Sequence, residues 1–514
     1  MAFYHERRQS ARHPPRGYPN FTTAAGDHAL QALTLGVGNT ALGTFSLFSV
    51  TTGSFNTAVG ALALDLNTAD SNTATGAAAL LFNTTGTENT ANGTAALEFN
   101  RTGRQNTANG AFALFNNGIG NFNTAIGFQA LFSNTEGLSN TAIGVQALQN
   151  DISGLHNTAI GVLALTGNTT GDLNTATGSA ALFSNTTGDL NTATGSAALL
   201  SNTTGNRNTG NGGSALQNNT TGNNNTARGF EALRSNLDGG GNTAAGFEAL
   251  KSNTSGAQNT ASGFEALTSN TTGDFNTAVG TGALSSNTVG AHNTAIGLHA
   301  LFTNTTGTHN IALGEVAGSD IRGDDNIAIG NVGNSGESET IHIGFLQIKT
   351  FIAGIRGVTT GINNAVPVMI DGAGQLGTMS SSRRFKKEIK AMDKRSEAIL
   401  SLNPVTFCYK SDNTNRPEFG LIAEEVAQVD SELVVRDDKS EIYTVRYDAV
   451  NAMLLNEFLK EHKAFVEEQR KVEQQQKEID AVKTELKEQR ALIEKVNDKM
   501  ELKASTSQTT ANNQ

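Results

Sequence analysis

Residues 174–190 read NTATGSAALFSNTTGDL, and the chain repeats this pattern with small changes over most of its length. The step between repeats is 17 residues almost throughout, with steps of 16 that end at Asn72 and Asn326. A period this strict is typical of a repeat architecture. The triplet Asn-Thr-Ala or a close variant begins at Asn39, Asn56, Asn72, Asn89, Asn106, Asn123, Asn140, Asn157, Asn174, Asn191, Asn208, Asn225, Asn242, Asn259, Asn276, Asn293, Asn310 and Asn326.

The repeated unit, N-T-A-x-G-x-x-A-L-x-S-N-T-T-G-x-x, predicts a β-solenoid. It is too short and too rich in glycine and asparagine for a helical repeat, and no proline lies between Pro19 and Pro367. Two short strands joined by turns fit its length, because glycine adopts positive φ without steric cost and asparagine tolerates it. We therefore expect one coil per unit, with Ala and Leu inside and Asn and Thr in turns or on outer faces. A single coil cannot offset its ordering entropy, so stability must come from neighbouring coils.

The residues of the array admit three other interpretations. The Asn-Thr-Thr triplets match a glycosylation acceptor, but they recur at a fixed place in the unit, which favours turn chemistry. A calcium-binding roll would need aspartate in every coil, whereas aspartate is sporadic, as at Asp172, Asp189 and Asp274. Ladders of threonine on a flat face could organise ice-like water, so an ice-binding solenoid stays an alternative. The triplets begin at Asn168, Asn185, Asn202, Asn219 and Asn270.

Composition excludes several classes of function. The formal net charge is -11, and the array has no Lys/Arg stripe, which argues against a nucleic-acid partner. The single cysteine, Cys408, rules out an intrachain disulfide and a cysteine metal cluster. No apolar run reaches 18 residues, so no membrane span is expected, and neither a cofactor nor a metal is predicted. The first twenty residues lack the apolar core of a Sec signal, so either another route of export, such as phage lysis, or a start further upstream is expected.

The sequence changes character after the array. The run IHIGFLQIKTFIAGIRGV, residues 341–358, predicts two or three strands, and Pro367, Asp371 and Gly374 mark a hairpin that ends at Met379. A helical face with Ile389, Met392, Ile399 and Leu402 follows and should end before Pro404. Strand-like segments at 405–410, 419–426, 434–435 and 442–447 then complete a small α+β domain.

From about Ala449 the chain reads as one continuous helix with a strict period of seven. Such a period predicts a left-handed coiled coil, and glutamine in the second column suits an oligomer whose register is specified at some cost in stability. The second column holds Glu468, Gln475, Val482, Gln489 and Val496. The apolar column, whose members are called the seam residues below, is Phe458, Phe465, Val472, Ile479, Leu486, Ile493 and Met500.

Two parts of the chain resemble known families. The units with NTAIG at Asn123, Asn140 and Asn293 resemble the head repeats of trimeric autotransporter adhesins, which are β-rolls packed as homotrimers and usually have a shorter unit. The string SSRRFKKEI, the later FGLIAEEV and the terminal helix resemble the intramolecular chaperone auto-processing domain of phage endosialidases, tailspikes and tail fibres. This second resemblance covers about 380 to 500. It implies a domain that trimerises, directs folding of the preceding fibre and then cuts itself off.

The chaperone resemblance also implies a site. The family motif, S-D-x-R-x-K with the cut just before the serine, falls on Ser381, Arg384 and Lys386, which places the scissile bond between Ser380 and Ser381. The aspartate position holds Ser382. Lysine activates a serine hydroxyl only when it is neutral, so burial and like-charged neighbours must favour its neutral form. Candidate neighbours are Arg383, Arg384 and Lys387.

These observations predict a mostly β, homotrimeric fibre or adhesin-like protein at the cell surface or on a virion, with a self-cleaving chaperone domain and no activity on an external substrate. A cell-surface glycan or receptor is a possible partner. A glycan-degrading tailspike is a second alternative, but the array offers no acidic pair at recurring geometry. The predicted parts are a disordered basic leader at 1–38, a β-solenoid at 39–340, a β connector at 341–380, an α+β chaperone domain at 381–450, a trimeric coiled-coil helix at 451–503 and a disordered tail at 504–514.

Overall fold

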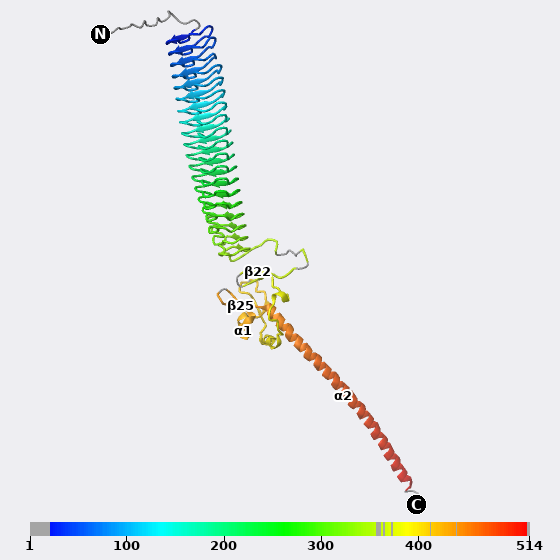
Figure 1. Cartoon of the computed structure of the whole chain (residues 1–514). Coiled ribbons are helices and arrows are strands. Elements are labelled where there is room, and N and C mark those ends of the chain that lie inside the picture. Colours follow the sequence, from blue (N-terminus) through cyan, green and yellow to red (C-terminus); the bar gives the residue numbers. More distant parts are fainter. Residues whose placement is uncertain are drawn as a thin grey trace, which may run out of the picture. The chain divides into compact units, whose positions relative to one another are not determined.

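The structure is a computed structural model that describes residues 21–355, 361–362, 365–371, 374–411, 413–437 and 439–510. The chain forms two compact units that divide between Thr350 and Phe351, and each is described by itself (Figure 1). Most of the predicted leader, the end of the apolar run at Val358, Gly372 of the predicted hairpin and the last four residues of the predicted tail lie outside the described residues.

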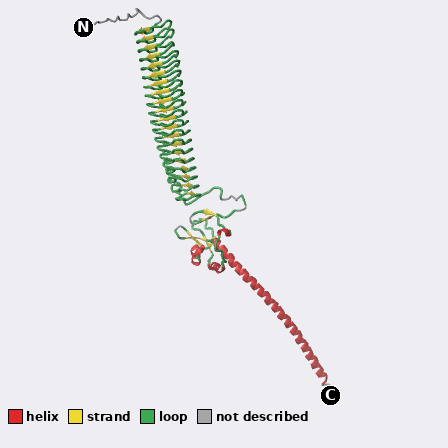
Figure 2. Cartoon of the chain, viewed as in Figure 1, coloured by secondary structure: helices red, strands yellow, loops and turns green. Residues whose placement is uncertain are grey.

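The first unit is a β-solenoid whose short strands form one 20-stranded sheet along one side of the coils (Figure 2). Its strands are β1 Thr23–Ala25, β2 Thr40–Leu42, β3 Thr57–Val59, β4 Thr73–Thr75, β5 Thr90–Asn92, β6 Thr107–Asn109, β7 Thr124–Ile126, β8 Thr141–Ile143, β9 Thr158–Ile160, β10 Thr175–Thr177, β11 Thr192–Thr194, β12 Thr209–Asn211, β13 Thr226–Arg228, β14 Thr243–Ala245, β15 Thr260–Ser262, β16 Thr277–Val279, β17 Thr294–Ile296, β18 Ile311–Leu313, β19 Ile327–Ile329 and β20 Ile341–Ile343.

Each strand pairs in parallel with the strand of the next coil, so that Thr175 lies beside Thr192 and Ala176 beside Ala193. One repeat is therefore one coil, as predicted. Each described coil has one strand rather than the expected two. The second apolar segment of the unit cannot be a strand, because Ala180 and Leu182 have φ of 54° and 52°, in the left-handed region.

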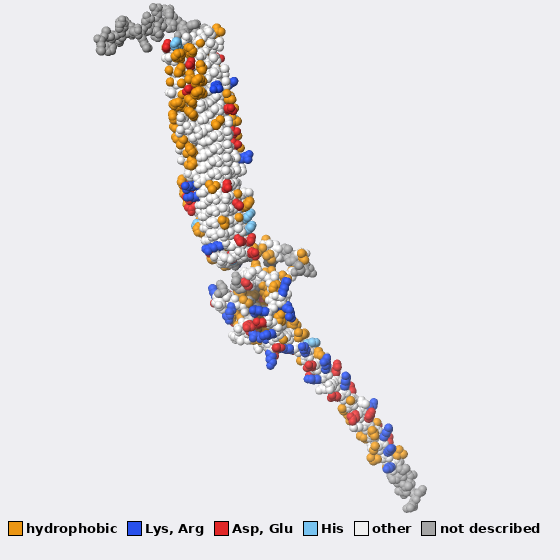
Figure 3. Space-filling model, in the orientation of Figure 1, with side chains coloured by type: hydrophobic (Ala, Val, Ile, Leu, Met, Phe, Trp, Pro, Cys, Tyr) orange, Lys and Arg blue, Asp and Glu red, His pale blue; other side chains and the backbone are white. Residues whose placement is uncertain are grey.

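The core is a stack of small apolar side chains, as predicted. In the coil that begins at Asn174, the side chains of Ala176, Ala181 and Leu182 are fully buried, and the same columns are buried in the other coils. Two alanines and one leucine per coil bury little apolar surface, so each coil gains most of its stability from the coils above and below it. Hydrophobic side chains also reach the surface, where they gather along one side of the first half of the solenoid (Figure 3).

The two asparagines that recur in each unit have their side chains inside the solenoid, so the prediction that they occupy outer faces is wrong, whereas other asparagines such as Asn92 and Asn223 are exposed as predicted. Both Asn174 and Asn185 are fully buried. The Nδ2 of Asn191 donates to Asn174 Oδ1 at 3.2 Å, and the Nδ2 of Asn185 donates to Asn168 Oδ1 at 2.8 Å. An amide carries both a donor and an acceptor, so a column of stacked amides satisfies its own members. Two such ladders run through the core.

The glycine that follows each strand is required by its backbone and by the next coil. Gly178 has φ of +134°, and a Cβ at this position would lie 2.5 Å from the carbonyl oxygen of Gly195. Only glycine, which has no Cβ, can adopt this conformation where two backbones approach so closely.

The solenoid extends beyond both predicted ends. It begins before residue 39, since β1 already pairs in register with β2. At the other end β20 is a solenoid strand rather than part of a connector, and residues 344–355 contain none of the further strands that the apolar run predicted. The solenoid is longer because the first and last coils keep the backbone pairing while their sequences lack the Asn-Thr-Ala triplet.

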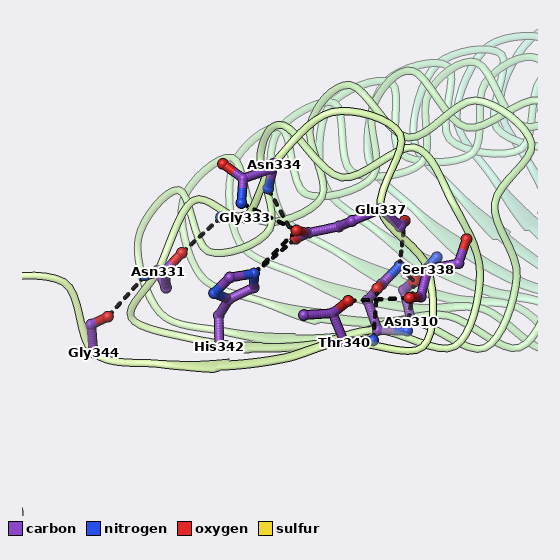
Figure 4. Close-up of polar contacts among 10 residues, drawn as sticks. Asn310, Asn331, Gly333, Asn334, Glu337, Ser338, Thr340, His342 and Gly344 are labelled. Carbon is purple, nitrogen blue, oxygen red and sulfur yellow. Dashed lines mark hydrogen bonds and ion pairs between the residues drawn. The ribbon is translucent and has the colours of Figure 1, made fainter. Parts of the chain in front are cut away.

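A polar cap closes the last coil (Figure 4). Here His342 takes the inward position that alanine holds elsewhere, beside Ala328 of the preceding strand. Its Nε2 lies 3.0 Å from Glu337 Oε1, to which the main-chain N–H of Asn334 also donates at 2.8 Å. Burial opposes ionisation of Glu337, but the hydrogen bonds from Asn334 and His342 outweigh it and lower the pKa of this carboxyl. The cap ends the apolar stack with groups that satisfy one another, as terminal repeats require.

The second unit is a small α+β domain with antiparallel strand pairs and a long helix. The hairpin strands β21 and β22 pair around Asp371, as the sequence predicted. The elements are β21 Met369–Ile370, β22 Leu376–Gly377, the 3-10 helix η1 Arg383–Phe385, the 3-10 helix η2 Asp393–Ser401, β23 Val405–Phe407, β24 Glu418–Gly420, α1 Ala423–Val429, the 3-10 helix η3 Ser431–Leu433, β25 Val434–Arg436, β26 Ile442–Val445 and α2 Tyr447–Thr510.

Two predicted elements of this unit differ in the structure. The helix expected from Ile389 is the 3-10 helix η2, and the segment 419–426 is a strand only as far as Gly420, after which α1 begins. The acidic residues Glu424 and Glu425 lie in the first turn of α1, where they favour a helix over a strand. The core that these elements share is Val426, Leu433, Val434, Val445 and Met453.

The helix α2 runs unbroken from Tyr447 to Thr510, past the predicted end at residue 503. All seven seam residues are exposed in the single chain, by 49% at Ile479 to 62% at Phe458. A row of large apolar side chains on an otherwise charged helix is a surface that another helix can cover.

Candidate functional site

The predicted site lies on a short turn that follows the β21–β22 hairpin of the second unit. Ser382 is extended, with φ of -65° and ψ of 141°, and it precedes the 3-10 helix η1. The main-chain N–H of Phe385 donates to Ser382 O at 3.0 Å, and that of Lys386 donates to Arg383 O at 3.1 Å. This single turn brings the residues on either side of it close together.

The turn brings the two predicted catalytic residues into contact. Lys386 Nζ donates to Ser381 Oγ at 3.2 Å. A hydrogen bond of this length joins a nucleophile and its base in serine-lysine chemistry. The five-residue spacing in the sequence therefore corresponds to the two ends of one 3-10 turn.

The surroundings of this pair are open and basic. Ser380, Ser381, Lys386 and the predicted supporting residues Arg383, Arg384 and Lys387 are all exposed in the single chain. The Arg384 guanidinium lies over the ring of Phe385, 4.6 Å from its centroid, so it is held beside the turn. The single chain thus supplies nearby positive charge but does not supply burial.

A second serine-lysine contact in this unit, in which Lys460 Nζ donates to Ser396 Oγ at 3.3 Å, has a structural role, and the sequence did not reveal it. Ser396 is fully buried between η2 and α2, and its Oγ donates to Glu457 Oε1 at 2.5 Å. The Nδ2 of Asn456 donates to Ser396 Oγ at 2.6 Å, and Lys460 Nζ donates to Glu457 Oε1 at 2.6 Å. The hydroxyl is enclosed and fully engaged, so this network fastens the start of α2 to the domain rather than presenting a nucleophile.

The charges of this network support each other. The hydrogen bond from Lys460, followed by that from Ser396, lowers the pKa of Glu457, and the hydrogen bond to Glu457 raises the pKa of Lys460. Spacing could have suggested the Glu457 and Lys460 pair, which are three residues apart on a helix. The contact with Ser396 joins residues more than fifty positions apart and depends on the tertiary fold.

An apolar groove of about 470 Å³ lies beside the start of α2. Phe419 at its rim is 83% exposed, and Leu454 is 57% exposed. Leu454 also precedes Phe458 by four residues, so the groove continues the apolar side of α2. The groove is lined by Ile399, Leu402, Pro404, Val405, Thr406, Phe419, Gly420, Leu421, Tyr447, Val450 and Leu454.

The array offers other side-chain patterns, but they belong to its interior. The asparagines of the Asn-Thr-Thr triplets, such as Asn185 and Asn202, are fully buried and hydrogen-bonded in the ladder, so the folded solenoid does not present them as acceptors for a glycan. Across the described ranges, no group of three or more His, Cys, Asp or Glu side chains is placed to hold a metal ion. None of the described helices has the length and apolarity needed to cross a membrane.

Comparison with known proteins gives one match, and it begins at the predicted nucleophile. No curated protein and no solved structure shows significant similarity to the chain. Residues 381–435 match the family model described as chaperone of endosialidase. The segment that begins with Ser381 and includes Lys386 is therefore similar to the chaperone of endosialidases, which confirms the resemblance carried by its motifs.

Proposed function

We propose that this chain is a homotrimeric fibre or adhesin-like protein of a virion or cell surface, whose C-terminal segment directs assembly and then releases itself. Ser381 is the nucleophile, Lys386 is the base, and the cut lies between Ser380 and Ser381. The observation that carries the proposal is the 3.2 Å contact between Lys386 Nζ and Ser381 Oγ, at the residue where the match to the chaperone family begins.

The chemistry needs only groups of the chain and water. Ser381 Oγ attacks the carbonyl carbon of Ser380 while Lys386 takes the hydroxyl proton. The C–N bond of the peptide then breaks, the proton passes to the released amine, and an ester joins the Ser380 carbonyl to Ser381 Oγ. Water hydrolyses this ester, which leaves a carboxylate on Ser380 and a free N-terminus on Ser381.

The exposure of Ser381 and Lys386 in the single chain supports cleavage that begins only after assembly. A lysine that acts as a base must lose its proton, and burial favours the neutral form. Neighbouring copies of the chain would cover the exposed turn and place Arg383, Arg384 and Lys387 around it. Cleavage would then follow assembly rather than precede it, which is the order that a fibre needs.

Two exposed apolar surfaces of the second unit support self-association. The seam residues follow a strict heptad, which only another helix of the same period covers along its full length. The groove beside Leu454 continues that side of the helix into the domain. Glutamine at Gln475 and Gln489 in the second column would favour one register over others, at some cost in stability.

The solenoid explains why such a segment would be needed. Nearly identical coils can associate one coil out of step at little energetic cost, so free chains would become trapped in wrong registers. If the copies are joined first at their C-termini, their ends are aligned, and the coils of neighbouring chains would then associate one after another from that end. Release of the chaperone would then remove the assembly route and leave a kinetically stable product.

The decisive experiment expresses the full chain and determines the mass and N-terminal sequence of its products. We expect a trimer with a separate fragment that begins at Ser381, and an intact 53.6 kDa chain for Ser381→Ala and for Lys386→Met. Ser382→Ala is the matched control, because this serine is adjacent and exposed but is not the proposed nucleophile, and it should still be cut.

Two outcomes would contradict the proposal separately. An intact wild-type chain in mature trimers, indistinguishable from Ser381→Ala on a denaturing gel, would remove the cleavage claim and leave assembly standing. A monomer in light scattering would remove the trimer.

The ice-binding alternative is not favoured by the solenoid surface. Outward threonines form one regular column along the sheet, but the neighbouring outward column is threonine only at Thr75, Thr177 and Thr194. A regular two-column threonine face is therefore limited to a few coils. A thermal-hysteresis measurement on the released solenoid should show no activity.

A further inference from the structure

Two columns of exposed side chains run along the solenoid on either side of the glycine that ends each strand. In one coil these are Ile143 and Val145, which flank Gly144. The first column is continuous, since Ile143 lies in register beside Ile126 and Ile160. In the second column, the rings of Phe247 and Phe264 stack with centroids 5.2 Å apart. We call these two columns the strand-end stripe.

Large apolar side chains form blocks within the stripe. One block is Ile126, Phe128, Ile143, Val145, Ile160 and Val162, each between 37% and 49% exposed. Another, nearer the C-terminal end of the solenoid, includes Phe230, Phe247, Phe264, Val279, Ile296 and Leu298, each between 38% and 51% exposed. Each block exposes on the order of 500 Å² of apolar surface, comparable to the ~300–600 Å² of the largest patch on a typical monomer, which is often functional.

Polar residues separate the blocks. Between Val162 and Arg228 the stripe consists of Thr177, Ser179, Thr194, Ser196, Asn211 and Gly213. Before Ile126 the first column is Thr75, Asn92 and Asn109. The residue types in the stripe therefore vary from coil to coil, although the coils themselves repeat. This contrasts with the buried columns, which repeat the same residues in almost every coil.

Charge is nearly absent from the stripe. From Leu42 to Ile329 its ionisable members are Arg228 and Glu315. Where a contact lies along the three-fold axis of a parallel homotrimer, equivalent residues of the copies meet, so a charge there would face its own copies. Depletion of charge is also the compositional mark of the buried centre of a protein interface.

We propose that the strand-end stripe is the face by which copies of the solenoid contact one another, and that its alternating blocks fix the register between chains. The inference rests on the proposed homotrimer and adds the surface that holds the shaft together. The occupant is a second copy of this chain, because α2 carries a seam that also needs copies to cover it, and helices so joined hold the solenoids at high local concentration.

The register follows from the spacing of the blocks. In register, each apolar coil meets the same apolar coil of its neighbour. A slip of three coils would bring Ile143 opposite Thr194 and place most of one apolar block against the polar segment. The interior of a coil is the same in either arrangement, so only surface columns that vary along the axis can distinguish the registers.

Cysteine crosslinking of the full chain tests the contact. In a Cys408→Ser background, Ile143→Cys should form an interchain disulfide under mild oxidation at least tenfold faster than Leu173→Cys. Leu173 is a matched control because it is 52% exposed in another column. To test the register, a tagged chain with Thr194→Cys is coexpressed with the Ile143→Cys chain. Disulfides between a Thr194→Cys chain and an Ile143→Cys chain should be much less abundant than disulfides between two Ile143→Cys chains.

A second pair of variants keeps the test independent of oxidation. Ile143→Glu with Val145→Glu should separate the solenoids after release of the C-terminal segment, whereas Leu173→Glu with Leu190→Glu should not. A charged side chain is compatible with the fold in each column used, since Arg228 occupies the column of Ile143, Glu315 that of Val145, and Glu88 that of Leu173 and Leu190. A wild-type chain that is monomeric in light scattering overturns the homotrimer itself. A trimeric wild type in which Ile143→Cys crosslinks no faster than Leu173→Cys overturns the stripe alone, and abundant mixed disulfides overturn the register.

Discussion

Asn168 Nδ2 donates to Asp151 Oδ1 at 2.7 Å, inside the column where the other coils hold asparagine. The aspartate interrupts the ladder on its other side. A carboxylate has no N–H to donate, and the buried Oδ1 of Asn134, one coil earlier, has no hydrogen-bond partner. Burial, and to a smaller extent the charge of Asp172, raises the pKa of Asp151 from 3.8 to about 7, although the hydrogen bond from Asn168 opposes the shift.

The buried carboxyl of Asp151 predicts that the free energy of unfolding falls as pH rises. The folded state holds the proton of Asp151 more tightly than the unfolded state, so the stabilisation is complete below pH 3.8 and is lost as pH rises through about 7. The shift corresponds to ~4 kcal/mol. The melting temperature of Asp151→Asn should exceed that of wild type at pH 8 and approach it near pH 4. Parallel melting curves for the two proteins across this range would contradict the assignment.

The asparagine ladder should be intolerant of truncation. Asn225→Ala removes the acceptor for the main-chain N–H of Asn242 at 2.9 Å and the donor to Gly239 O at 2.8 Å. Groups buried without partners cost roughly 2–4 kcal/mol in total. Hydrogen exchange should show lost protection in the coils on either side of residue 225. Thr221→Ala, at an exposed turn position of the preceding coil, should leave protection unchanged.

The glycine after each strand should not accept alanine. Gly178→Ala would put a methyl group 2.5 Å from the carbonyl oxygen of Gly195 and force a residue with Cβ to φ of +134°. We expect a loss of at least about 3 kcal/mol, measured as a lower melting temperature. Gly213→Ala is the control, because its Cβ would come no closer than 3.3 Å to the Phe230 ring and alanine occupies its column in other coils. Equal effects of the two substitutions would contradict this reasoning.

The turn that holds the proposed dyad should respond to its first residue. Ser382 precedes η1, but its side chain makes no hydrogen bond to the turn. Ser382→Asp offers a better acceptor to the N–H groups of the turn and restores the residue of the family motif. We expect release of the C-terminal fragment to be several-fold faster, followed on denaturing gels over time. Ser382→Asn supplies a similar acceptor without charge, so faster release with both variants indicates ordering of the turn. Slower release with both would contradict this role.

The seam of α2 should control assembly. Ile479→Glu with Leu486→Glu places carboxylates in the apolar column, where copies of the helix would bring them together. The full chain should lose the proposed trimer in light scattering, and release of the fragment should fall with it, since in the proposed mechanism neighbouring copies bury Ser381 and Lys386. Ala481→Glu adds the same group outside the seam and should leave both unchanged. Full cleavage of a monomeric seam variant would show that assembly is not needed for the chemistry.

Much of the solenoid could be read from the repeat alone. The 17-residue period gave one coil per unit, and the alanine and leucine columns were placed inside because only they are apolar in every unit. The number of strands in each coil could not be predicted from the repeat. The segment around Ala180 and Leu182 looks strand-like in composition, but both residues adopt positive φ, which depends on hydrogen bonds to the coils on either side.

The candidate site also has one part that the sequence predicts and another part that only the tertiary fold decides. The spacing of Ser381 and Lys386 followed from a motif, and a single turn is enough to make them meet. The contact between Ser396 and Glu457 joins distant segments and has no local signal, although the spacing of Glu457 and Lys460 along one helix suggests that these two pair.

The sequence by itself determined the coil, its apolar columns and the heptad of the last helix, because each of these depends on a period along one chain. The tertiary structure alone decided that asparagine belongs inside. A buried amide is costly in one isolated coil, but a stack of identical coils gives every amide a donor and an acceptor in its neighbours. The Asn174 side chain is therefore stabilised by the repetition of the coil, a property that no single unit of the sequence displays.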